Sequence, residues 1–209
     1  MSLAGRVFAA LYDPMMARTE KAGLADRRRT VLQHARGRVL EVGGGTGANL
    51  PFYGEAVEEV VFTEPEEPMA RRLERKLASS RLRARVVRAP AEQLPFEEAS
   101  FDSVVSTLVL CTVPDQARAL AEIHRVLKPG GQLLLIEHVR SGDAKVARWQ
   151  DRLNGINRRI GHGCNCNRET LAAVERAGFR IEHVERGSLP KAPAITRPLV
   201  VGVAERAAA

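Results

Sequence analysis

Residues 37–50 read Gly-Arg-Val-Leu-Glu-Val-Gly-Gly-Gly-Thr-Gly-Ala-Asn-Leu, and this stretch decides the fold. Its first part is apolar and β-branched without helical spacing, and four glycines follow at once. Such a run is typical of a buried strand that ends in a tight turn. Glycine tolerates positive φ and lets a ligand approach the backbone closely. A loop of this kind that leads into a helix presents free N–H groups, so we expect a nucleotide-like ligand here, with an ordinary strand–turn as the alternative.

Two classes of ligand use this geometry. Gly43, Gly45 and Ala48 satisfy the dinucleotide pattern G-x-G-x-x-G/A, which favours an NAD-dependent oxidoreductase. Glu41 favours another ligand, because a carboxylate repels a pyrophosphate but attracts an ammonium or a sulfonium. S-adenosylmethionine (SAM) carries both of these cations and no phosphate. Residues 41–47 resemble motif I of the class I SAM-dependent methyltransferases, E/D-x-G-x-G-x-G, which implies SAM contacts from Glu41, Gly43, Gly45 and Gly47.

Length and composition are those of one globular domain. The chain has 209 residues, of which 44% are hydrophobic and 27% charged, which predicts a single domain over residues 1–209. Three cysteines do not suggest a disulfide framework. The sequence shows no apolar run of membrane-spanning length and no long apolar segment of a secretory signal at its start. We therefore expect a cytoplasmic protein.

The formal net charge of +7 is uneven, with an excess of arginine in residues 1–38. A basic face can meet anionic lipid, nucleic acid or an acidic substrate. Aromatic residues do not interleave with these charges, so we expect no nucleic-acid partner. Peripheral membrane contact and a plain solvated helix both remain open, and the sequence does not predict an oligomeric state.

Strand-like and helical patterns alternate along the chain. The expected strands are residues 38–42, 59–63, 85–88, 101–107 and 132–138, and the first helices between them are 68–79 and 116–127. This alternation predicts βαβ units and a parallel sheet. Lys-Pro-Gly-Gly at residues 128–131 is expected to stop a helix and turn the chain into the fifth strand.

The regular alternation of strands and helices ends after this fifth strand. Residues 141–167 predict an amphipathic helix set over the sheet edge as a cap insertion, and residues 1–36 form an N-terminal helical cap segment. A helix at 168–177 and strands at 179–185 and 199–204 complete the pattern. The expected fold is α/β, a three-layer Rossmann-like seven-stranded mostly parallel sheet with an antiparallel last strand, as in the class I methyltransferases.

Further segments resemble the type 11, UbiE-like methyltransferases. They are residues 91–96, 100–105 and 126–131. In that family an Asp near the adenine often precedes the alanine, and here Pro90 stands in its place, which leaves the adenine contact to Ala91 or Glu92. Glu64 follows the second strand, where the fold places an acid on the ribose hydroxyls. The resemblance implies further SAM contacts from Tyr12, Asn49, Pro65, Thr107 and Leu108.

A narrower resemblance is to the methyltransferase-like thiol S-methyltransferase subfamily. It rests on residues 107–113, 137–139, 163–165 and 168–169, and it implies a small lipophilic thiol as methyl acceptor. Those relatives sit on membranes through an N-terminal anchor, whereas residues 7–12 are only a brief apolar patch. A phospholipid amine or a quinone carbon is the alternative acceptor. A nucleotide-binding oxidoreductase or a SAM-binding module without activity is the alternative of another class.

Methyl transfer requires alignment more than acid–base chemistry. A thiol with a pKa near about 8.5 is partly ionised at neutral pH, so it needs little help from a base, whereas a phenol or carbon acid needs one. His138 ends the fifth strand, and we predict that it acts as a base or orients the acceptor, with a backbone-bonded histidine as the alternative. The residues expected to line the acceptor pocket are Cys111, Trp149 and Leu153.

His162, Cys164 and Cys166 lie close together in sequence and suggest a metal site. Their spacing is not C-x-x-C, and a fourth ligand is missing unless Cys111 contributes. We therefore predict no metal. A soft metalloid held by three cysteines is an alternative acceptor, and the roles of these residues remain open at this point.

Overall fold

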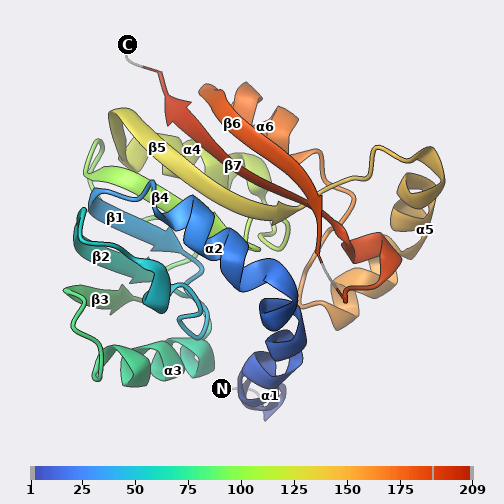
Figure 1. Cartoon of the computed structure of the whole chain (residues 1–209), viewed down its shortest axis with the longest axis horizontal. Coiled ribbons are helices and arrows are strands. Elements are labelled where there is room, and N and C mark those ends of the chain that lie inside the picture. The colour runs from blue at the N-terminus through green and yellow to red at the C-terminus, as the bar shows by residue number, and fades with distance from the viewer. Residues whose placement is uncertain (1–2, 190, 208–209) are drawn as a thin grey trace.

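One mixed sheet organises the computed structural model of the chain, which describes residues 3–189 and 191–207. The strand order is β3-β2-β1-β4-β5-β7-β6, and β7 runs antiparallel to both of its neighbours (Figure 1). The predicted seven-stranded, mostly parallel sheet is therefore confirmed. The strands are β1 Gly37–Val42, β2 Val57–Thr63, β3 Ala84–Val87, β4 Phe101–Thr107, β5 Leu127–His138, β6 Phe179–Ser188 and β7 Pro198–Arg206.

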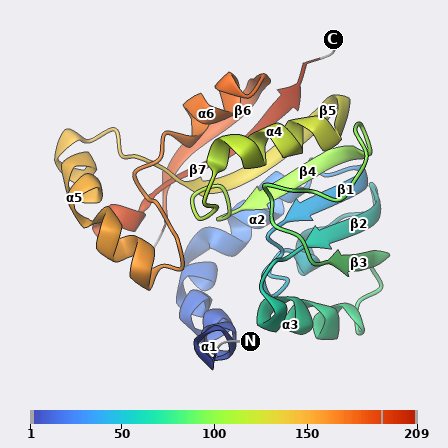
Figure 2. The same cartoon turned by 180° about the vertical axis from the view of Figure 1, so that it is seen from behind.

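Helices cover both faces of the sheet. Helices α2 and α3 lie on one face, and α4 and α6 lie on the other (Figures 1 and 2). The α-helices are α1 Leu3–Thr19, α2 Ala25–Leu32, α3 Glu67–Leu77, α4 Gln116–Val126, α5 Ala144–Ile160 and α6 Thr170–Arg176. Short helical turns are η1 Glu20–Leu24, η2 Leu50–Phe52 and η3 Ala194–Thr196.

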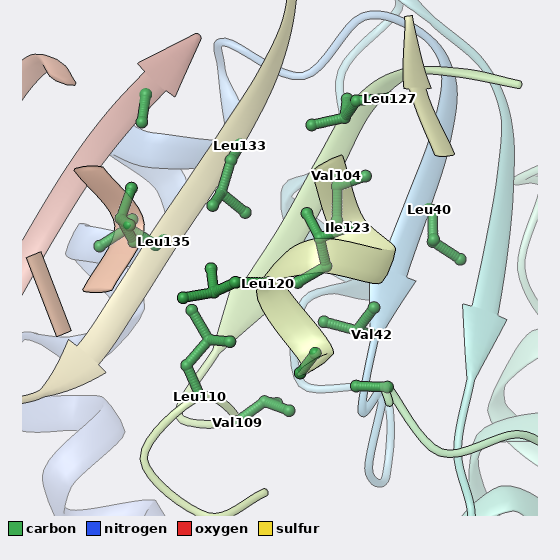
Figure 3. Packing of buried hydrophobic residues seen from close by; sticks show 14 of the residues in the cluster. Leu40, Val42, Val104, Val109, Leu110, Leu120, Ile123, Leu127, Leu133 and Leu135 are labelled. Carbon is green, nitrogen blue, oxygen red and sulfur yellow. The ribbon is translucent and has the colours of Figure 1, made fainter. Parts of the chain in front are cut away.

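The central strands are apolar on both sides because both faces are covered. Val39 and Leu40 are adjacent in β1, point to opposite faces and are both fully buried. This explains why the sequence of β1 shows no alternation of apolar and polar residues. Figure 3 shows one of the two cores, in which Leu40 and Val104 of the sheet lie beside Ile123 of α4.

Two local expectations were wrong. No α-helix follows the glycine loop, because η2 is a three-residue 3-10 turn that ends before Tyr53 and leads to Gly54 and β2. Helix α4 ends at Val126, just before the Lys-Pro-Gly-Gly segment, as expected, but this segment lies inside β5 rather than before it. Pairing with β4 jumps there from Phe101↔Leu127 to Ser103↔Gln132, so the extra residues form a bulge with Gly130 at φ +72°.

The N-terminal segment leaves the sheet and crosses its carboxyl edge. α2 packs on the sheet, and the chain bends at Gly23, which has φ +128° within η1. Beyond this bend α1 extends toward α3 and toward the connection between α5 and α6 (Figure 2). None of the helices within residues 3–189 and 191–207 is both long and apolar enough to cross a membrane.

Candidate cofactor and acceptor site

Functional side chains gather where the three neighbouring parallel strands β2, β1 and β4 end. Glu41 lies near the end of β1, between Phe62 of β2 and Val105 of β4 in the register. Glu64 follows β2, and Thr107 ends β4. Because the strands are parallel, these ends meet at one edge of the sheet, which is where open α/β sheets bind their ligands.

Glu41 is a buried carboxylate with one close hydroxyl partner. It is 3% exposed, and its Oε2 accepts a hydrogen bond from the hydroxyl of Tyr53. Burial raises its pKa to about 7, although the Tyr53 hydrogen bond, the Arg28 charge and an Asn49 hydrogen bond act in the opposite direction. A carboxyl group with such a pKa gains most from a cation placed beside it. An ammonium or sulfonium fits this position.

The carboxylate of Glu64 accepts hydrogen bonds from backbone N–H groups rather than from side chains. Its Oε2 accepts from the N–H of Gly45 at 2.8 Å, and its Oε1 accepts from the N–H of Glu66 at 2.8 Å. Burial raises its pKa, while these two hydrogen bonds favour the charged form. Each oxygen keeps a lone pair, so the carboxylate can still accept from vicinal hydroxyls.

The glycine loop is packed on one side and open on another. A Cβ at Gly43 would lie 2.6 Å from Val109 Cγ2, whereas a Cβ at Gly45 would find no atom nearer than 3.9 Å. Both residues have positive φ, at +59° and +55°. The loop therefore needs glycine at both positions for its conformation, and only at Gly45 does the backbone face open space. The carboxylates of Glu41 and Glu64 and the open space beside Gly45 fit SAM.

Buried polar contacts connect the glycine loop to the N-terminal segment. Arg28 is 3% exposed, donates to Asn49 Oδ1 at 2.8 Å and pairs with Glu20 at 2.9 Å. Asn49 in turn donates to Thr107 Oγ1 at 3.0 Å. The predicted residues Asn49 and Thr107 are thus brought together. Sequence analysis missed Arg28, because its charge is indistinguishable there from those of its exposed neighbours.

Helix α1 lies over the same loop. Asp13 accepts from Thr46 Oγ1 at 2.5 Å and from Lys76 Nζ at 2.9 Å. Although partial burial acts in the opposite direction, these two donors lower the pKa of Asp13. A pocket of about 610 Å³ lies between α1, the end of the glycine loop, η2 and the end of α3, and its lining includes Tyr12 and Gly47. Asp13 and Thr46 were missed because their sequence carries no signal beyond ordinary polarity.

His138 is buried and bonded to backbone. Its imidazole is 8% exposed and interacts with the backbone of Pro198 and Thr196, and Nδ1 has no hydrogen-bond partner. Burial lowers its pKa to about 4, against the effect of these backbone contacts. The ring is therefore neutral at pH 7 and a weak proton acceptor.

The three cysteines form one buried cluster. Cys111 and Cys166 are fully buried, Cys164 is 7% exposed, and all three thiols are free. His162 lies apart from them, with its ring stacked on Phe8 of α1 at 3.3 Å between centroids. In the part of the chain that the structure describes, no group of three or more His, Cys, Asp or Glu residues is arranged to hold a metal ion.

The other predicted residues lie around the edge. Ala91 is buried, Pro65 is exposed, and Glu92 accepts from the N–H of Asp115 at 3.3 Å. Trp149 is 54% exposed on α5, with the Arg152 guanidinium 5.8 Å from its ring centre. Like Leu153, which is half-buried, it is outside the lining of the pocket between α1 and the glycine loop.

Comparison with known proteins identifies relatives of the whole chain. A family model described as a methyltransferase domain matches residues 40–135. The human thiol S-methyltransferase TMT1A is 32% identical over 94% of this chain and 82% of its own. A phosphatidylethanolamine N-methyltransferase from Cereibacter sphaeroides is 30% identical over 85% of each chain. A SAM-dependent methyltransferase from Thermotoga maritima has a similar fold, with a TM-score of 0.70, 22% identity and coverage of 96% of this chain and 97% of that one.

The contrast between Gly43 and Gly45 gives a matched test. We expect Gly43→Ala to lower the free energy of unfolding by about 2–4 kcal/mol, since the new methyl group meets Val109 and the φ is left-handed. Gly45→Ala should lose only about 1–2 kcal/mol, from φ alone, yet weaken SAM binding by at least about tenfold because its methyl group faces the ligand. Urea unfolding and calorimetric titration measure the two effects. Wild-type SAM affinity in Gly45→Ala would place the ligand elsewhere.

Affinity for SAM should depend on pH through Glu41. With a pKa of about 7 in the free protein, this acid is mostly protonated at pH 6, and a cationic ligand must drive the proton off. We expect the Kd to rise by roughly one order of magnitude between pH 7.5 and pH 6, with proton release on binding. Glu41→Gln is the control, in which affinity is low and this slope is absent. An unchanged slope in Glu41→Gln contradicts the assignment.

Proposed function

The chain belongs to the class I SAM-dependent methyltransferases, and from this premise we propose that it methylates the sulfur of a small lipophilic thiol. The observation that carries the proposal is the 32% identity to a thiol S-methyltransferase across 94% of the chain. The phosphatidylethanolamine N-methyltransferase, at 30% identity over 85% of the chain, supports the alternative acceptor, a phospholipid amine.

The protonation state of His138 supports a thiol. A quinol or carbon acid needs a base with a pKa near neutral, and the His138 ring has a pKa of about 4. Glu41 has a suitable pKa of about 7 but is hydrogen-bonded to Tyr53 at the proposed cofactor position. A thiol instead ionises in water to a useful extent on its own.

SAM supplies, when bound, a methyl group on a sulfonium, which a thiolate accepts to leave a thioether and S-adenosylhomocysteine. The residues of the chain would hold the two reactants in line. Glu41 and Glu64 would bind the cationic end and the ribose, and Tyr12 of α1 would cover them. Excluding water and fixing this alignment lower the barrier of such a displacement by several kcal/mol in order of magnitude.

The acceptor class is tested by release of S-adenosylhomocysteine. The three probes are an N-acylated cysteine ester, phosphatidylethanolamine vesicles and a hydroquinone. We expect turnover on the cysteine ester, with a rate that rises about tenfold per pH unit below a thiol pKa of about 8.5. Turnover on the vesicles alone would contradict the thiol and favour the amine.

His138→Ala tests whether a base takes part. Since the neutral, backbone-bonded ring is a weak base, we expect thiol turnover to fall by less than about threefold after correction for stability. The pH profile should keep its shape. A fall of a hundredfold or more in a folded variant, at unchanged SAM affinity, would instead make His138 the catalytic base or the group that orients the acceptor.

A further inference from the structure

Glu137, next to His138 in β5, is a fully buried carboxylate with four hydrogen-bond donors. Its Oε1 accepts from Ser106 Oγ at 2.8 Å and from the N–H groups of Val109 at 2.9 Å and Leu110 at 3.0 Å. Its Oε2 accepts from the N–H of Cys111 at 3.1 Å. Three successive backbone donors thus converge on one side chain.

The position of Glu137 makes this charge unexpected. Leu133 and Leu135 precede it on the same face of β5, and both are buried in the core against α4 (Figure 3). An apolar residue would continue that pattern without the desolvation penalty of a carboxylate, which reaches several kcal/mol. Burial raises the pKa of Glu137, and its four donors act in the opposite direction. Packing alone therefore does not explain why a carboxylate is buried at this position.

The loop that Glu137 holds has an unfavourable conformation. Leu108 has φ +59°, which residues other than glycine, Asn and Asp rarely adopt. From Val109 the chain makes a single helical turn, in which Thr112 and Val113 donate back to the Val109 carbonyl. The carboxylate of Glu137 accepts from the first N–H groups of this turn, as an N-cap does.

This loop, residues 108–113, lies between the glycine loop and the segment that follows α5. On the cofactor side, the Val109 side chain fills the space beside Gly43. On the other side, the carbonyl of Leu110 accepts from Arg168 at 2.6 Å, and that of Cys111 accepts from the N–H of Asn165 at 2.7 Å. The loop is thus held by its N–H groups from β5 and by its carbonyls from the segment after α5.

We propose that Glu137 is a positioning residue. It holds loop 108–113 in the conformation that aligns the cofactor with the methyl acceptor. It acts through the backbone of Val109, Leu110 and Cys111 and touches neither reactant. The proposal rests on the methyltransferase activity and not on the identity of the acceptor.

Glu137→Gln tests it, because the amide keeps the shape of the side chain but turns one acceptor oxygen into a donor that faces an N–H group. We expect amide hydrogen exchange of residues 109–111 to accelerate by about tenfold or more, with no change in β1 and β2. SAM affinity should stay within about threefold, whereas kcat on whichever probe the wild type methylates should fall by about tenfold or more, because alignment is lost. Ser106→Ala is the matched control, since it removes one donor and leaves the three backbone contacts.

Two results would overturn the proposal. One is unchanged exchange of residues 109–111 in a folded Glu137→Gln protein. The other is that Ser106→Ala and Glu137→Gln lose thermal stability and kcat to the same extent. That result would mean that Glu137 only stabilises the fold. If Glu137→Gln does not fold, Glu137→Asp keeps the charge but withdraws it by one methylene, and the same exchange pattern is expected. Because exchange and SAM binding need no acceptor, they decide this inference even where the thiol proposal fails.

Discussion

The site depends on the burial of carboxylates at the carboxyl edge of the sheet. The three acids there, Glu137, Glu64 and Glu41, differ in how many hydrogen bonds they accept from the protein. Glu137 has four donors and is complete without a ligand. Glu64 has two backbone donors and free lone pairs. Glu41 has the Tyr53 hydroxyl, and burial raises its pKa to about 7. The acid whose pKa burial raises to about 7 is the one best suited to a cationic ligand.

The N-terminal segment joins this edge through charge rather than through apolar packing alone. Arg28 links Glu20 of η1 with Asn49 of the glycine loop, and Asp13 of α1 links Thr46 of the same loop with Lys76 of α3. The bend at Gly23 lies between the two contacts. Helix α1 and the glycine loop therefore share a hydrogen bond, so that displacement of α1 would leave Thr46 without its partner Asp13.

The cap insertion is held to the sheet by amide side chains. Gln150 of α5 is fully buried, and its Nε2 donates to the carbonyls of Val139, Cys166 and Ile195 at 2.8–3.0 Å. Its Oε1 accepts from the N–H of Ser141. Buried backbone carbonyls require such partners, and here they fix the segment that also contacts loop 108–113. Helix α5 and the segment after it thereby support that loop.

The sequence by itself determined the sheet, most element bounds and the acids at the strand ends, because apolar runs, glycines and strand termini are local signals. Tertiary structure alone decided which polar groups meet. Tyr53 reaches Glu41 because no α-helix follows the glycine loop, and Cys111 meets Cys164 because the cap folds back. The exposure of Trp149 depends on which face of α5 packs, and helical periodicity leaves that choice open. These contacts join residues from 12 to more than 50 positions apart, and only the packed sheet brings them together.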